Sequence, residues 1–163
     1  MTTYLDCNAT TPMEHEVAVE LRHYFEEEYG NSGSRSHEFG ARAKAAVQSA
    51  RKSVAGVVNC QPDEVLFTSG ATEANNLAIL GLEHFGRQND QLHIVTTSIE
   101  HKAVLEPIET LEARGFEVTV VDPKPTGRVD SQALLQAVRT DTLLVSVMHA
   151  NNETGVLQPL KEI

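Results

Sequence analysis

The sequence predicts an α/β fold built on a mainly parallel sheet. From residue 64 onward, short apolar segments alternate with segments of helical periodicity, which is typical of right-handed βαβ units. The apolar segments cover 64–68, 93–97, 116–121 and 142–148. We therefore expect four parallel strands, with any ligand bound at the edge of the sheet where the strands end.

Two helices are expected before the first strand. Residues 15–29 repeat apolar side chains at helical spacing, and Gly30 ends the segment. A polar loop, "GNSGSRSH", separates this helix from a second one over 38–57, which carries a stripe of alanine, valine and phenylalanine side chains. Each segment thus has the single apolar face of an amphipathic helix.

Three further helices connect the predicted strands, over 71–86, 102–114 and 130–139. Asp130 is the expected N-cap of the last of these. The final residues, "LQPLKEI", match the first turn of another helix, with Pro159 near its first position. A natural domain rarely ends in such a turn, so we expect a truncated polypeptide.

The composition is that of a globular protein with its own core. The 163 residues are 40% hydrophobic, and the net charge of −10 argues against a nucleic acid or an anionic membrane as a direct partner. No apolar run approaches the roughly 18 residues of a membrane span, and no signal peptide is recognised. Cys7 and Cys60 form no C-x-x-C pattern, which favours a reducing, cytoplasmic setting, while a disulfide between them stays open.

The stretch "EVLFTSGATEANNLAIL" ends the first predicted strand and begins a helix. One interpretation is a capped helix, in which Gly70 permits the turn and Thr72 or Glu73 caps the first turn. The other is an anion site, because the first turn of a helix presents unpaired N–H groups, to which Ser69 and Thr72 add hydroxyl donors. The stretch contains neither a P-loop nor a GxGxxG fingerprint, and its spacing leaves both interpretations open.

Three polar stretches follow predicted strands and should meet at one edge of the sheet, namely 69–76, 98–102 and 149–155. His101 is either an exposed or capping residue, or a ring that stacks on a planar ligand and moves a proton. Lys102 is not expected to form a Schiff base at the same ligand, because neighbouring helical residues point about 100° apart.

The third stretch contains "NNETG". Asn151 suits a turn, but a side-chain amide at the end of a strand is also a good donor to a phenolate-type oxygen. Glu153 is either a carboxylate of the site or a salt-bridge partner.

Other site chemistries find little support. The seven histidines lack the spacing of metal ligands, so we expect no metal site, and His93 is grouped with the surface histidines. Cys7 is expected to be a small half-buried side chain rather than a nucleophile.

Five stretches, in this order, resemble the N-terminal part of a cysteine desulfurase: "YLDCNATTP", "GNSGSRSHEFG", "VLFTSGATEANNLAI", "IEHKAVLEP" and "LVSVMHANNETGVLQPL". These enzymes are pyridoxal 5'-phosphate (PLP) enzymes of the class V aminotransferase group with the fold-type-I architecture. The resemblance covers essentially the whole chain and implies a three-layer α/β/α sandwich. It also implies that residues 1–14 belong to the small domain or active-site loop, and residues 15–163 to a truncated PLP-binding large domain.

The resemblance implies roles for four residues. The "SGATE" turn of the family holds the PLP phosphate, which implies contacts from Ala71 and Thr72. The histidine of "EHKAV", here His101, stacks on the pyridine ring and acts as an acid or base. The second asparagine of "NNE", here Asn152, bonds the phenolic oxygen of the ring.

The implied reaction removes sulfur from L-cysteine and gives L-alanine and an enzyme persulfide. The persulfide passes to a sulfur-acceptor protein, for iron–sulfur cluster assembly or for tRNA or DNA modification, and the intact enzymes are homodimers. In the family the Schiff-base lysine and the persulfide cysteine follow the matched part, so we expect the chain alone to lack desulfurase activity. Two alternatives stay open: a selenocysteine lyase or another class V PLP enzyme, and a non-catalytic module that pairs with a full-length subunit.

Overall fold

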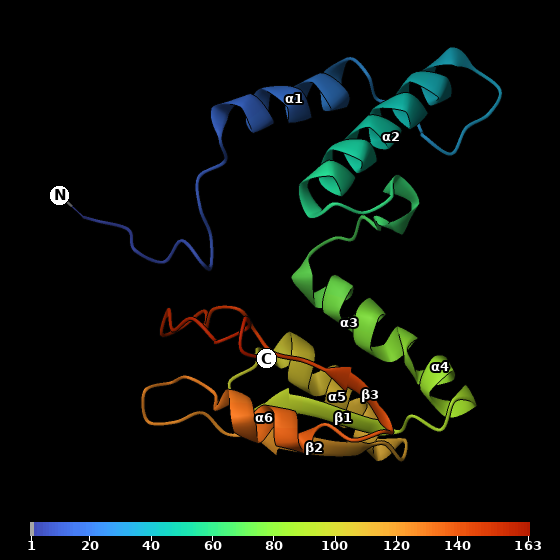
Figure 1. Ribbon diagram of the computed structural model, residues 1–163. Coiled ribbons are helices and arrows are strands. Elements are labelled where there is room, and N and C mark those ends of the chain that lie inside the picture. Colours follow the sequence, from blue (N-terminus) through green and yellow to red (C-terminus); the bar gives the residue numbers. More distant parts are fainter. Residues whose placement is uncertain (1) are drawn as a thin grey trace. The chain divides into compact units, whose positions relative to one another are not determined.

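The computed structural model describes residues 2–163, which fold as two compact units (Figure 1). The first unit ends at Phe67 and is called here the helical unit. The second, Thr68–Ile163, is called the sheet unit. The boundary falls inside the stretch 64–68 that the sequence assigns to a single strand.

The helical unit contains α1 (His15–Glu26), α2 (Glu38–Val58) and a short 3-10 helix, η1 (Pro62–Glu64). Both predicted helices are confirmed, although α1 ends at Glu26 rather than at residue 29. The Nδ1 atom of His37 accepts a hydrogen bond from the N–H of Gly40 at 3.1 Å and so caps α2.

The polar loop before α2 folds back onto the first turn of that helix. The side-chain oxygen of Asn31 accepts a hydrogen bond from the N–H of Gly33 at 2.8 Å, and the carbonyl of Asn31 accepts one from Ser34 at 3.0 Å. A Cβ atom on Gly40 would lie 2.5 Å from the carbonyl oxygen of Ser34. Glycine is therefore required at this position, because any side chain would push the loop away.

The predicted strand at 64–68 is wrong. Glu64 ends η1, and its carboxylate accepts a hydrogen bond from the N–H of Gln61 at 2.6 Å. The carbonyl of Val65 accepts a hydrogen bond from the guanidinium of Arg51 instead of from a neighbouring strand. Phe67 is half exposed, with that guanidinium 5.0 Å from the centre of its ring. Local partners therefore take the groups that a sheet would have paired.

The sheet unit contains a parallel sheet of β1 (His93–Thr97), β2 (Glu117–Val121) and β3 (Thr142–Val145). The strand order is β2-β1-β3, so β1 is central, and all five of its residues are buried. The predicted parallel sheet is thus confirmed, with three strands rather than four within residues 2–163.

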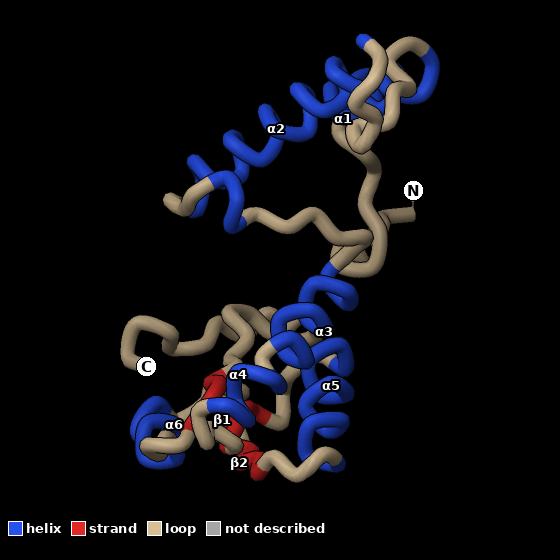
Figure 2. Tube along the Cα trace, turned by 90° about the vertical axis from the view of Figure 1, so that its right-hand side faces the viewer, coloured by secondary structure: helices blue, strands red, loops and turns tan. Residues whose placement is uncertain are grey.

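Helices cover both faces of this sheet. Figure 2 shows α5 (Lys102–Ala113) and α6 (Ser131–Ala137) on opposite sides of the strands, which confirms the three-layer α/β/α arrangement. The side chain of Asp130 caps α6 as predicted, because it accepts a hydrogen bond from the N–H of Gln132 at 3.1 Å. Residues 160–162 form a turn rather than the start of a further helix.

The predicted helix over 71–86 is two helices in the structure. α3 (Ala71–Gly81) and α4 (Glu83–Gln88) are separated by Leu82. The N–H of Leu82 bonds to the carbonyl of Ile79, only three residues back, at 3.3 Å. This tightened turn follows Gly81, a residue with low helix propensity, so the break falls where the helix is intrinsically weakest.

Two apolar clusters lie on the two faces of the sheet. Ile94 of β1 joins the cluster on the α3 and α5 side, and Val95 joins the cluster on the α6 side. Successive strand residues point to opposite faces, so neighbouring positions of β1 serve separate clusters. The buried members are Ile79, Ile94, Val104, Ile108, Leu111 and Phe116 on the first side, and Val95, Val129 and Leu134 on the second.

His93 is not a surface residue as the sequence analysis expects. It is fully buried at the first position of β1, and its ring bridges to both neighbouring strands. Nδ1 lies 2.8 Å from the hydroxyl of Thr142, and Nε2 lies 2.9 Å from the hydroxyl of Thr119. Burial, followed by the nearby positive charge of Arg139, lowers the pKa of His93 below its ordinary value.

Candidate functional site

The loops that follow β1 and β3 lie together at the carboxyl edge of the sheet. The side-chain amide of Asn151 donates a hydrogen bond to the carbonyl of Ile99 at 3.2 Å. The carboxylate of Glu100 accepts a hydrogen bond from the N–H of Met148. Two of the three predicted polar stretches are therefore brought into contact, as parallel strand ends require.

Glu100 is the residue of this region that the sequence analysis misses. It is 9% exposed, and one carboxylate oxygen accepts hydrogen bonds from both Met148 and the hydroxyl of Thr97, the latter at 3.4 Å. Burial raises the pKa of Glu100, and the two hydrogen bonds oppose that rise. The sequence signal that could have identified Glu100 is an acidic residue between an apolar predicted strand and His101.

His101 caps α5. Its Nδ1 atom accepts a hydrogen bond from the N–H of Ala103 at 3.1 Å, and the residue is exposed. Because Nδ1 is an acceptor, the neutral ring carries its proton on Nε2. The structure thus confirms the capping interpretation of His101 and also leaves an N–H donor on the exposed side of the ring. Lys102 is the first helical residue and is exposed as well.

The two asparagines of "NNETG" are used differently. The side-chain oxygen of Asn151 accepts hydrogen bonds from the N–H groups of Glu153 at 3.1 Å and Thr154 at 2.9 Å, and from the Thr154 hydroxyl at 3.0 Å. Asn151 is therefore the turn-forming residue that its position predicts. Asn152 lies within the turn and is exposed.

The first turn of α3 is anchored separately from these two loops. The N–H and the hydroxyl of Ser69 both donate to the carboxylate of Glu73, each at 2.6 Å, and these bonds lower the pKa of Glu73. The first helical hydrogen bond runs from Ala74 to the carbonyl of Gly70. The N–H groups of Ala71 and Thr72 precede that bond and have no acceptor within the helix. The expected role of Glu73 in closing this turn is confirmed, and the anion site stays a prediction.

α3 reaches the sheet through its second half. Ile79 packs in the same cluster as Val104 and Ile108 of α5, whereas Ala71 and Thr72 are exposed. The expectation that all three polar stretches follow strands of one sheet is wrong, because the residues before α3 form no strand. Hydrogen bonds join the segments that carry His101 and Asn152.

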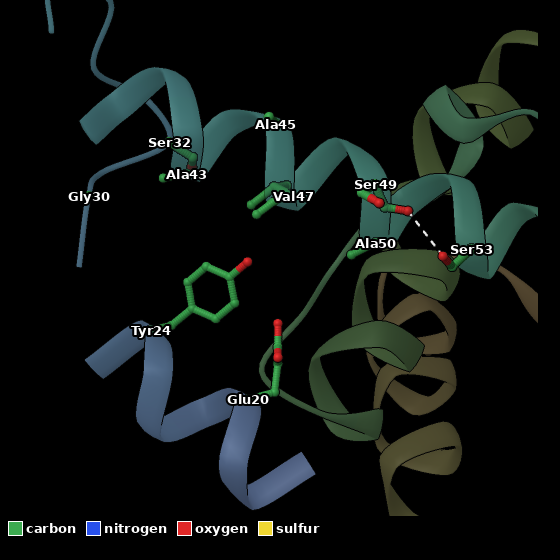
Figure 3. A pocket seen from close by; sticks show the side chains of 11 residues that line it. Glu20, Tyr24, Gly30, Ser32, Ala43, Ala45, Val47, Ser49, Ala50 and Ser53 are labelled. Carbon is green, nitrogen blue, oxygen red and sulfur yellow. Dashed lines mark hydrogen bonds between the residues drawn. The ribbon is translucent and has the colours of Figure 1, made fainter. Parts of the chain in front are cut away.

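One cavity lies within the helical unit and is lined by none of these residues. It measures about 780 Å³ between α1 and α2, where Figure 3 shows Glu20 and Tyr24 pointing toward the small residues of α2. Its remaining lining includes Ala43, Ala46 and Ala50, whose short side chains leave the space open. Because its only charged group is the carboxylate of Glu20, this cavity does not suit a phosphate.

Metal ligands and disulfides do not account for the polar residues of the site. Within residues 2–163, no group of three or more His, Cys, Asp or Glu side chains is placed to hold a metal ion. Cys7 and Cys60 are free thiols, and Cys7 is exposed rather than half-buried. No helix in the described part of the chain is both long and apolar enough to cross a bilayer.

A parallel sheet covered on both faces, with polar loops at its carboxyl edge, defines an α/β protein of the kind that binds ligands beyond its strand ends. Comparison with known families makes this class specific. Residues 3–163 match the family described as aminotransferase class-V, and the chain belongs to that family.

Relatives and solved structures agree with this assignment. A protein of Anaeromyxobacter sp. (strain K) named cysteine desulfurase IscS is 49% identical over 160 residues, which are 98% of this chain and 39% of that protein. The crystal structure of DndA from Streptomyces lividans matches with a TM-score of 0.85 and 53% identity, over 98% of this chain and 44% of that one.

A third match is a structure described as SspA in complex with cysteine. Its TM-score is 0.91 and its identity 38%, over 99% of this chain and 46% of that one. The chain spans about two fifths of the length of the curated relatives that it matches.

Proposed function

We propose that the 163-residue chain is the part of a PLP-dependent cysteine desulfurase that holds the cofactor. The whole enzyme would remove sulfur from L-cysteine and give L-alanine and an enzyme persulfide. The observation that carries the proposal is the 49% identity, over nearly the whole chain, to proteins named cysteine desulfurase IscS. The SspA match, determined with cysteine, supports the same substrate.

The donor set of the sheet unit suits PLP. The phosphate is a dianion, and the first turn of α3 offers the N–H groups of Ala71 and Thr72, the Thr72 hydroxyl and the positive end of the helix dipole. The phenolic oxygen of PLP is a hydrogen-bond acceptor, for which the side-chain amide of Asn152 is the proposed donor. Bound PLP would supply an electron sink for bond cleavage next to an amino group.

His101 is the proposed acid or base of the site. The bond from Ala103 to Nδ1 fixes which ring nitrogen faces outward, so proton transfer would take place at Nε2. The exposed face of the ring is also the proposed stacking surface for the pyridine of PLP. In this assignment Ala71 and Thr72 bind the phosphate of PLP, and Asn152 orients its ring. His101 orients the ring as well and moves a proton.

Several features of the whole enzyme are part of the same proposal. We assign residues 1–14 to the small domain or active-site loop and residues 15–163 to the large PLP-binding domain. We also propose that the enzyme is a cytoplasmic homodimer that passes sulfur to an acceptor protein, as in iron–sulfur cluster assembly. The two free cysteines, which form no disulfide, fit a reducing compartment.

A PLP titration of the chain tests the site. Absorbance between roughly 330 and 430 nm follows binding to the unaltered chain and to the Thr72→Ala/His101→Ala double variant, and we expect saturable binding that is lost in the variant. Thr126→Ala/His84→Ala is the matched control, because it removes the same side chains from exposed positions outside the proposed site. Absence of saturable binding, or equal binding by all three chains, would refute the assigned residues.

A further inference from the structure

Within the described part of the chain, the buried carboxylate of Glu100 is held by neutral groups alone. Glutamate is rarely buried unless it is paired, yet within residues 2–163 no basic side chain forms an ion pair with Glu100. Its partners are instead the backbone N–H of Met148 and the hydroxyl of Thr97. Both are neutral donors, so Glu100 acts as a hydrogen-bond acceptor rather than as half of a salt bridge.

The position of this carboxylate links the two loops of the candidate site. Glu100 directly precedes His101, and Met148 lies in the segment between β3 and Asn152. A second hydrogen bond, from the side-chain amide of Asn151 to the carbonyl of Ile99, joins the same segments at 3.2 Å, again with its donor in the segment that follows β3. The two bonds together fix the start of α5 against the turn that Asn151 organises.

We infer that Glu100 is a positioning residue, whose carboxylate oxygen holds the segment of His101 in register with the segment of Asn152 by accepting the hydrogen bond of Met148. The inference rests on the proposed function, since it concerns the two residues proposed to contact the ring of PLP. Glu100 itself is buried and is not proposed to touch the cofactor.

If Glu100 acts as a hydrogen-bond acceptor, only substitutions that keep an acceptor oxygen should preserve its role. Glutamine keeps an acceptor oxygen at the same distance from the backbone, whereas methionine fills a similar volume without one. The raised pKa of Glu100 supports the use of glutamine, because burial already disfavours the charged form. Glu100→Gln should therefore preserve the link, and Glu100→Met should remove it.

The first readout needs no cofactor. Hydrogen exchange and amide chemical shifts are measured by NMR on the full chain. In Glu100→Met we expect the amide of Met148 to exchange about tenfold faster, which is the effect of losing one hydrogen bond to a buried carboxylate, and the amides of His101 and Asn152 to shift. In Glu100→Gln exchange should stay within about twofold, and the core amide of Val95 should be unchanged in both.

The second readout is the dissociation constant for PLP. We expect Glu100→Met to raise it about tenfold and Glu100→Gln to leave it within about twofold of the unaltered chain. Glu106→Met is the matched control, because Glu106 is an exposed glutamate on α5. Glu100→Asp, which keeps the carboxylate but is one methylene shorter, should move both readouts in the same direction as Glu100→Met and replaces it if that variant does not fold.

The outcomes separate this inference from the proposed function. If the unaltered chain does not bind PLP, the cofactor assignment fails, and the NMR measurements alone decide whether Glu100 links the two segments. If the unaltered chain binds PLP but Glu100→Met behaves like Glu106→Met in both readouts, the positioning role is overturned. It is also overturned if Glu100→Gln is as impaired as Glu100→Met, because charge rather than acceptance would then be the requirement.

Discussion

The hydrogen bond between His93 and Thr119 allows a sharp test of how the sheet is held together. Thr119 lies on β2, and its hydroxyl is 2.9 Å from Nε2 of the fully buried His93 ring on the central strand. Thr119→Val keeps the shape of the side chain and its β-branching but removes the hydroxyl. The other ring nitrogen keeps its bond to Thr142 at 2.8 Å, so the substitution isolates one interaction.

The expected loss of stability follows from the ring nitrogen of His93 that Thr119→Val leaves without a hydrogen-bond partner. A buried imidazole nitrogen without a partner loses about 1–3 kcal/mol, so we expect Thr119→Val to lower the free energy of unfolding of the sheet unit by about 2 kcal/mol. For a unit of this size, that corresponds to a fall in Tm of about 8–16 °C. Thermal unfolding followed by circular dichroism measures the change.

A double-mutant cycle supplies the control. In a His93→Leu background the ring nitrogen is already absent, so adding Thr119→Val should cost about 0–0.5 kcal/mol, and the coupling energy should be about 1.5 kcal/mol. If Thr119→Val costs the same in both backgrounds, its effect comes from β2 alone, and the proposed bridge across the strands is refuted.

Four further outcomes are expected. Burial raises the pKa of Glu100 above its ordinary value near 4.5. The stability contributed by the protonated side chain is therefore fully present below that pH and is lost as the pH rises through the folded pKa. Thermal unfolding of Glu100→Gln should lack this decline in stability with rising pH. Histidine 15N NMR should show His101 protonated on Nε2 and not on Nδ1 at alkaline pH, and signals from the opposite tautomer would contradict the cap. Gln158→Leu should cost about 2–4 kcal/mol in urea unfolding, because it strips partners from the N–H of Val129 and the carbonyl of Gly127, and a change under 1 kcal/mol would contradict this. The pure 163-residue chain should release no more sulfide from L-cysteine than a boiled sample.

Periodicity predicts most of the sheet unit because its signals are local. The alternation of apolar strands with amphipathic helices locates β1, β2 and β3 and the three-layer arrangement. The stretch 64–68 looks equally strand-like, but a strand forms only where a neighbour pairs with it. Glu64 and the carbonyl of Val65 find partners within the helical unit instead, and sequence periodicity carries no information about that competition.

The candidate site is predictable to the extent that it depends on position along the chain. Strand ends point to the segments 98–102 and 149–155, and the turn chemistry of Asn151 can be inferred from its residue type. Glu100 and His93 are missed for one shared reason. Each is a polar residue buried at or just beyond an end of the central strand, and each has one partner that lies 48 or 49 residues further along the chain. Only tertiary structure reveals such pairs.

His93 and Glu100 also make opposite contributions to the pH dependence of stability around β1. Burial lowers the pKa of His93, so its neutral ring contributes full stability above its ordinary pKa of 6.5, and that contribution declines as the medium becomes acidic. Glu100, at the other end of the strand, responds in the opposite sense. Acidification therefore weakens the contribution of His93 to stability while it restores that of Glu100, so these two groups oppose each other. Replacing one of the pair would unmask the slope of the other.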